Sequence, residues 1–248
     1  MSEMLSLVNP LAFGRTSQVQ RIAVAIGEEL EISTLWDVKI AAMLFPLGCV
    51  TVSETALECA LSGRPIPERE QAVYAQHAAI AGNMLKQIPR LESVSAIVAY
   101  QDKCFDGSGS PQDDVSGNDI PIGARILKVA SDFETAYKRT GDTSLALEEL
   151  HDGVGRYDPT VLKSLRNALR KGLCQSSQRE VSKNELTEGM VFASDVRTLS
   201  GQLMVTSGQE VTESTRRRLQ DLCERGAIEG KFQVEMLGTM ESSELVTF

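Results

Sequence analysis

The chain has 248 residues, a net charge of −9 and 42% hydrophobic residues, which suffices for one large domain or a main domain with a small one. Proteins that bind nucleic acid usually carry a basic surface, so we expect no nucleic-acid partner. No run of about 18 apolar residues could span a bilayer and no apolar N-terminal segment suits a signal peptide. These features predict a cytoplasmic protein without a membrane partner.

Apolar residues at helical spacing predict a series of helices up to residue 171. The predicted helices cover residues 17–30, 34–47, 67–88, 91–100, 122–137, 142–150 and 159–171. Pro46 should kink or end the second helix, because proline cannot donate a backbone hydrogen bond. Residues 104–121 are rich in Gly, Asp, Ser and Pro and predict a loop.

The longest of these helices, residues 67–88, carries one stripe of side chains that includes a histidine. Its members are Val73, His77, Ile80, Met84 and Ile88. A histidine on an apolar stripe is usually buried and hydrogen-bonded, and we expect this of His77.

The periodicity changes after a polar segment at residues 174–180, which predicts a linker. Two β-like segments follow at residues 190–196 and 203–211, then a helix at 213–225 capped by Thr212 and a last strand at 232–237. The fold class is therefore mainly α. We predict a helical bundle over residues 1–175, followed by a small α+β module over residues 176–248.

The five cysteines form neither a CxxC pair nor a Cys/His spacing typical of zinc. They are Cys49, Cys59, Cys104, Cys174 and Cys223. An odd number of unpaired thiols fits a reducing compartment.

Two stretches resemble a known family. Residues 105–111 read FDGSGSP, and residues 120–130 read IPIGARILKVA. They resemble the bacterial HD-GYP domain, which reads WDGSGYP and then IPLGARIL-VAD, and the resemblance extends over residues 10–170. The tail from Val181 resembles a C-terminal module of some HD-domain response regulators. The resemblance implies an HD-domain-like helical bundle.

The resemblance also implies a chemistry. Members of the family hydrolyse cyclic di-GMP with a cluster of iron or similar metals, which histidines and aspartates hold. The metals neutralise the phosphate and generate hydroxide from bound water. Such a cluster needs several nitrogen and oxygen ligands at one point.

The ligand positions of the family fall here on residues that bind metal poorly or not at all. Its His-Asp pair falls at Phe45-Pro46, its tandem histidines fall at Gln101-Asp102, and its later aspartate falls at Ser131. Further positions, for an early histidine, a lysine and a glutamate, fall at Arg15, Cys49 and Lys103. Of the family's ligand residues, only the histidine at His77 survives.

We therefore predict no metal ion, no cofactor and no catalytic residue, and a pocket that is a remnant of the family's site. Its residues are Phe45, Pro46, His77, Gln101, Asp102 and Ser131. On this interpretation the chain is not an enzyme, and it acts in bacterial signal transduction by contact with a protein partner or with itself. Members of the family often follow a receiver domain. No βα repeat precedes Leu11, so we expect a partner in trans or a chain that is a fragment.

Three alternatives remain open. The chain is a metal-dependent phosphohydrolase with a rebuilt site, for which Asp102, Asp132 and Glu134 are candidate ligands. Alternatively, it is an inactive receptor for a cyclic dinucleotide, although the acidic Asp113 and Asp114 predict that cyclic di-GMP does not bind. The third alternative is a thiol pair or soft-metal site formed by Cys49 and Cys104.

Overall fold

The computed structural model describes residues 15–171 and 177–236. The chain divides into two compact units, residues 1–173 and 174–248, and each is described by itself. The unit of residues 1–173 is helical, and the other is a small α+β unit. The predicted mainly α fold class is confirmed.

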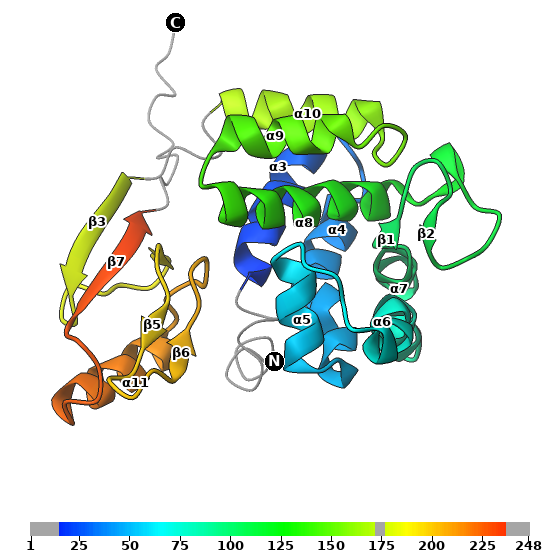
Figure 1. Cartoon of the computed structure of the whole chain (residues 1–248). Helices are drawn as coiled ribbons and strands as arrows, with labels where there is room; N and C mark the ends of the chain where they lie inside the picture. Colours follow the sequence, from blue (N-terminus) through cyan, green and yellow to red (C-terminus); the bar gives the residue numbers. More distant parts are fainter. Residues whose placement is uncertain (1–14, 172–176, 237–248) are drawn as a thin grey trace, which may run out of the picture. The chain divides into compact units, whose positions relative to one another are not determined.

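The helical unit is built around α8 (Figure 1). Its elements are α3 (Thr16–Glu29), α4 (Leu35–Leu44), η1 (Phe45–Thr51), α5 (Glu54–Leu61), α6 (Glu68–Lys86), α7 (Glu92–Ala99), α8 (Ile122–Thr140), α9 (Thr143–Asp152) and α10 (Pro159–Arg170). Helix α8 packs against α3, α4, α7, α9 and α10. It buries apolar side chains over several turns, among them Ile126, Val129 and Phe133. The pocket predicted from the sequence lies beside this central helix, which contributes Leu127 and Ser131 to its lining.

Two aspartates begin helices as the sequence predicts. Asp142 accepts hydrogen bonds from the backbone N–H groups of Ser144 and Leu145, and Asp158 accepts one from Thr160. Such caps satisfy backbone donors that have no partner within the helix. Pro46 has the expected effect too, because α4 ends at Leu44 and continues as the 3₁₀ helix η1.

One face of α6 differs from the predicted inward stripe. Val73, Met84 and Ile88 are 44%, 49% and 47% exposed, whereas His77 is buried with Ala78, Ala81, Gly82 and Leu85. The small residues allow close packing, since a Cβ at Gly82 would lie 2.7 Å from Ala99 Cβ on α7. Val73, Met84 and Ile88 are thus exposed to solvent, and His77 is the residue of this stripe that is buried in the core.

The predicted loop contains a short hairpin. Strands β1 (Asp102–Lys103) and β2 (Gly109–Ser110) pair with Asp102 opposite Ser110, and η2 (Gly117–Asp119) follows. Gly109 has a positive φ of 87°, and a Cβ there would lie 2.3 Å from Asp102 O. Glycine is therefore required where the loop returns to the strand that carries Asp102.

The C-terminal unit has its own core. Its elements are β3 (Ser177–Ser182), β4 (Val191–Phe192), β5 (Val196–Arg197), β6 (Leu203–Val205), α11 (Glu213–Glu224) and β7 (Lys231–Met236), with strand orders β3-β7-β4 and β5-β6. Phe192 and Phe232 meet edge to face within this core. The predicted linker is wrong over residues 177–180, because the whole polar stretch from Ser177 pairs with β7.

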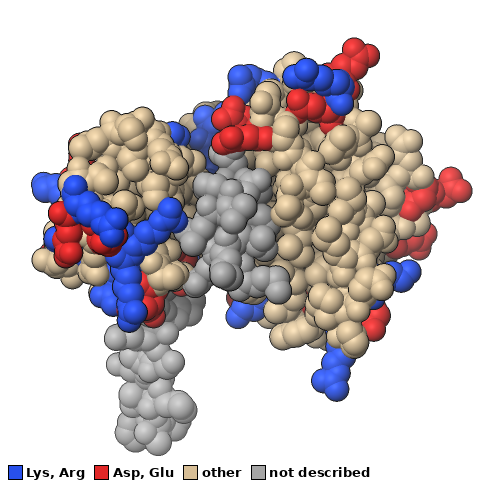
Figure 2. Space-filling view, turned by 90° about the horizontal axis from the view of Figure 1, so that it is seen from below, with Lys and Arg blue, Asp and Glu red and all other residues tan. Residues whose placement is uncertain are grey.

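The basic side chains of this unit lie beside acidic ones (Figure 2). Arg216 and Arg217 of α11 both pair with Glu213, and Lys231 pairs with Glu180. Charges that neutralise each other in this way do not form the one-sign surface that nucleic acid requires. Among the described helices, none is both long and apolar enough to cross a bilayer.

Candidate functional site

One cavity of about 60 Å³ lies between α6, α8, η1 and the start of β1. All six residues of the predicted remnant pocket line it, and Arg15, Cys49 and Tyr74 join them. A space of this size is large enough for a few water molecules. Solvent reaches the site at Asp102, whose side chain is 37% exposed.

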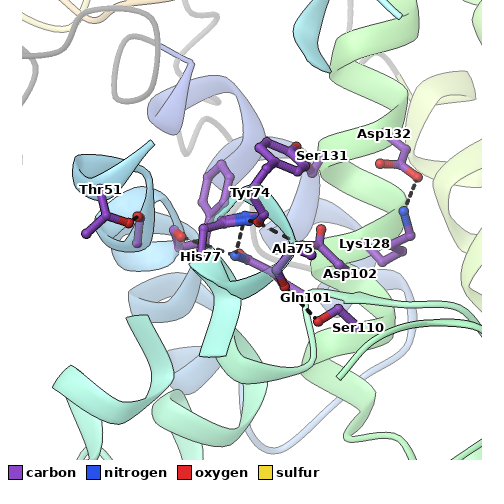
Figure 3. Close-up of polar contacts among 12 residues, drawn as sticks. Thr51, Tyr74, Ala75, His77, Gln101, Asp102, Ser110, Lys128, Ser131 and Asp132 are labelled. Atoms are coloured by element: carbon purple, nitrogen blue, oxygen red, sulfur yellow. Dashed lines mark hydrogen bonds and ion pairs between the residues drawn. The ribbon is translucent and has the colours of Figure 1, made fainter. Parts of the chain in front are cut away.

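His77 is held in one orientation by the backbone of its own helix (Figure 3). Its Nδ1 lies 2.6 Å from Tyr74 O, and since a carbonyl only accepts, Nδ1 carries the proton. Nε2 lies 3.2 Å from Gln101 Nε2, and in the tautomer that carries its proton on Nδ1 it accepts a hydrogen bond from this amide. This arrangement orients Nε2 as it is oriented in histidines that bind metal.

Two oxygen atoms accompany that lone pair. Asp102 Oδ2 lies 3.5 Å from His77 Nε2. Gln101 is 4% exposed, and its Oε1 has no hydrogen-bond partner within the described residues. Together with Gln101 Oε1, these two atoms form a polar wall, in which His77 Nε2 lies against Gln101 Nε2 and Asp102 interacts electrostatically with Lys128.

Arg15 also lines the cavity. Its Nη2 donates to Ser131 O at 2.6 Å and to Thr135 Oγ1 at 2.7 Å, and lies 2.6 Å from Glu134 Oε2. The Arg15 and Glu134 side chains are 8% and 1% exposed. The sequence did not predict this buried ion pair. Two signals in the sequence were available for it. Arg15 is a charged residue at a ligand position of the family, and Glu134 is a charged residue within the apolar pattern of α8.

The candidate carboxylates of a rebuilt site do not converge. Asp132 receives hydrogen bonds from Lys128 and Tyr157, Glu134 pairs with Arg15, and Asp102 faces His77. Burial alone would lower the pKa of Lys128, but Asp132 and Asp102 outweigh it and raise that pKa. Lys128 therefore stays cationic and balances Asp132.

Cys49 and Cys104 do not form one site either. Cys49 lines the cavity, and burial, with Asp102 adding to it, raises the pKa of its thiol to about 12. Cys104 is also buried, but it contacts the Arg156 side chain, away from the residues that line the cavity. At neutral pH the Cys49 thiol is protonated and is a poor ligand and nucleophile.

The predicted acidic loop is partly neutralised. Lys103, whose side chain is fully buried, lies 3.0 Å from Asp113 Oδ1, and Tyr100 donates to the other oxygen of Asp113 at 2.7 Å. The hydrogen bond from Tyr100, aided by Lys103, lowers the pKa of Asp113. Asp114 remains exposed. The repulsion expected from two free carboxylates is therefore weaker than the sequence indicated.

A family model for the HD domain matches residues 1–161, well over half of the chain. The chain belongs to the HD domain family. The resemblance to HD-GYP domains is thereby confirmed, and no curated protein matches.

Solved structures share the fold. A phosphodiesterase of V. cholerae described as specific for cyclic GMP-AMP, V-cGAP3, is 19% identical with a TM-score of 0.53, over 69% of this chain and 49% of that one. The HD domain of the L. monocytogenes phosphodiesterase PgpH is 15% identical with a TM-score of 0.51, over 69% of this chain and 96% of that one. This chain thus matches about half the length of V-cGAP3.

The prediction that the chain is not an enzyme is wrong on these findings. It belongs to the HD domain family, whose solved members of similar fold are phosphodiesterases, and this points to a family of phosphohydrolases. Nothing in the described residues shows that the chain is inactive.

The family's metal cluster nevertheless does not fit this pocket. Within the described residues, no group of three or more His, Cys, Asp or Glu side chains could hold a metal ion. The atoms in this pocket that could hold a single cation are His77 Nε2, Asp102 Oδ2 and Gln101 Oε1. Magnesium-like ions keep several waters and take only one or two carboxylates from the protein.

Proposed function

We propose that this chain is a phosphohydrolase of the HD domain family with a rebuilt site for one divalent cation, and that it acts in bacterial signal transduction in the cytoplasm. The observation that carries this proposal is the wall formed by His77, Gln101 and Asp102. It holds an imidazole nitrogen, a carboxylate and a buried amide oxygen that has no hydrogen-bond partner within the described residues. A cation there would bind the two oxygens, and also the nitrogen once Gln101 Nε2 no longer donates to it.

The residues have distinct roles in this proposal. His77 and Asp102 would hold the cation, which would neutralise a phosphate group and lower the pKa of a bound water. Tyr74 O keeps His77 in the tautomer that presents Nε2 to the cavity. The small cavity accepts the phosphoryl part of a substrate and leaves its larger parts in solvent, which reaches the site at Asp102.

The test measures metal binding and turnover of the purified full chain. Titration with Mn²⁺ should reveal about one bound ion, and His77→Ala or Asp102→Asn should weaken its affinity at least about tenfold, as is usual for altered metal sites. Hydrolysis of bis(p-nitrophenyl) phosphate, cyclic di-GMP and cyclic GMP-AMP should fall with the metal affinity. His151→Ala is the matched control, because His151 is exposed on α9.

Two results would contradict the proposal. One is the absence of binding at millimolar Mn²⁺ together with no turnover of any of the three substrates. The other is metal binding that His77→Ala and His151→Ala weaken equally, since the ion would then lie elsewhere.

A second candidate function, protein contact through self-association, is favoured by the exposed apolar stripe of α6. Val73, Met84 and Ile88 present it to solvent. Light scattering after gel filtration should show a dimer that Met84→Glu dissociates, whereas Leu145→Glu on α9, also at an exposed apolar residue, should not. A monomeric wild-type chain at high concentration would exclude this role.

A further inference from the structure

The C-terminal unit contains a groove of its own, with a volume of about 340 Å³. Two consecutive stretches line most of it, residues 194–199 around β5 and residues 231–233 of β7. The face of a strand presents only alternate side chains, so a groove that touches every residue in turn runs along strand edges. Val196 and Phe232 agree with this, because their side chains are buried in the core of the unit and they meet the groove mainly through backbone.

One of these edges is the half of β7 that β4 does not cover. Strand β4 pairs with Val234 and Glu235, and Ala193 N–H donates to Gln233 O just beyond it. Backbone groups alternate in direction along an antiparallel strand, so Lys231, two residues before Gln233, directs its N–H and C=O to the same side. None of the described strands pairs with Lys231 on that side.

The second edge belongs to β5. This strand pairs with β6 on one side, and among the described strands it has no partner on the other. Leu199, two residues after β5, is 74% exposed and lines the same groove. An open row of N–H and C=O groups is a template for another strand, and proteins usually keep such edges short or covered. Here two open edges and an exposed leucine border one groove.

The charged side chains of the groove restrict what it can hold. Arg197 pairs with Asp195, and Lys231 pairs with Glu180. Glu229 is exposed at the groove and has no ion pair within the described residues. The uncompensated charge is therefore negative, which favours an occupant with a basic side chain and disfavours an acidic one.

We propose that this groove is a docking site for an extended segment of a partner protein, which adds a strand to the open edge of β7 and carries a basic and an apolar side chain. Main-chain hydrogen bonds to Lys231 would supply affinity, and Glu229 and Leu199 would select the side chains. The interaction goes beyond the proposed phosphohydrolase activity and does not depend on it.

The probes are octapeptides selected from a random phage library on the immobilised full chain, then synthesised with a fluorescent label. Fluorescence anisotropy should show saturable binding to the wild type by peptides that contain Lys or Arg beside Val, Ile or Leu. Lys231→Pro removes the N–H that faces the groove, so affinity should fall about tenfold, the effect of one lost hydrogen bond. Lys231→Ala is the matched control. It keeps that N–H, and affinity should change less than about fivefold because exposed ion pairs contribute little.

Two further measurements do not require the proline variant to fold. Methylation of alternate backbone nitrogens in the peptide keeps its side chains but blocks main-chain pairing, and should also lower affinity about tenfold. Hydrogen exchange followed by NMR should show that the Lys231 amide exchanges fast in the free chain and becomes protected when peptide binds. The Phe232 amide, on the β3 side of β7, should be protected in both states.

Several results would overturn the proposal. One is that no selected peptide binds at millimolar concentration. Others are equal affinity for the wild type and a Lys231→Pro variant that circular dichroism shows to be folded, equal affinity of methylated and unmethylated peptides, and a Lys231 amide already protected in the free chain. A dimer that the peptides dissociate would assign the groove to a second copy of the chain, and the partner protein would then be excluded.

Discussion

Lys103 Nζ lies 3.0 Å from Asp113 Oδ1, and this contact closes the glycine-rich loop onto β1. The same ammonium donates to Pro111 O at 2.8 Å and to Asp113 O at 3.0 Å. Ser110 adds a hydrogen bond to Ala75 O on α6. A lysine where the family has a glutamate thus serves the shape of the loop.

Replacing Lys103 with methionine should loosen this loop while filling most of the same space. Three acceptors would lose a charged donor, and even one such hydrogen bond contributes about 1.5–3 kcal/mol, so we expect a loss of at least about 2 kcal/mol in the free energy of unfolding. Urea denaturation measures the loss, and hydrogen exchange should localise it to residues 104–121. A change below about 0.5 kcal/mol would show that solvent replaces the lysine fully.

Gly48→Ala should deform the wall of the cavity. A Cβ at Gly48 would lie 1.8 Å from His77 O, so the backbone of η1 or α6 must move. We expect a loss of about 3 kcal/mol, at the upper end of overpacking in a core, and a lower Mn²⁺ affinity. Gly141→Ala is a suitable comparison, because no atom lies near its Cβ position and its cost arises from its positive φ alone.

Breaking the Arg125–Asp158 pair should weaken the junction of α8 and α10 without touching the cavity. Asp158 also caps α10, so Asp158→Ala removes a cap and leaves Arg125 without its buried partner. Together these losses should lower the free energy of unfolding by about 4 kcal/mol. Thermal unfolding by calorimetry tests this, and a loss under about 1 kcal/mol would contradict it.

The thiols should differ strongly in reactivity. Since the pKa of Cys49 is raised from 9.0 to about 12, its thiolate fraction at pH 8 is about 1,000-fold below that of an ordinary thiol. Labelling with iodoacetamide should therefore leave Cys49 unmodified while the partly exposed Cys59 and Cys223 react. The rate at Cys49 should keep rising with pH beyond pH 9, and mass spectrometry of peptides follows each site. Fast labelling of Cys49 at pH 8 would show that the cavity opens.

Much of the helical unit could be predicted from sequence because its signals are local. Asp142 and Asp158 cap the helices that their positions predict, and Pro46 ends α4. The spacing of apolar residues alone could not predict which face of α6 is buried. Alanines and a glycine, rather than its larger apolar residues, make the close contact with the core. Strand β3 was missed because a polar edge strand carries no apolar alternation, and because its residues pair with residues of β7 that lie 49 to 59 positions further along the chain.

The candidate site, too, could be predicted from the sequence only in part. The family motif was enough to select six of the residues that line the cavity. The side chains and backbone groups that those residues contact could not be predicted from the sequence. Arg15 meets Glu134, and Lys103 is buried under Pro111, through tertiary contacts that residue type alone does not indicate. The orientation of His77 depends on a backbone carbonyl, which no side-chain pattern reveals.

The position of η1 also matters for engineering. Phe45 and Pro46 already stand on the wall of the cavity that holds His77, so a designer need not move any helix to bring new donors there. Phe45→His with Pro46→Asp would restore two ligand types at once, and Arg15→His would supply a third once Glu134 is made neutral. With this geometry, metal ligands can be added one at a time, and the effect of each ligand on metal affinity can be measured separately.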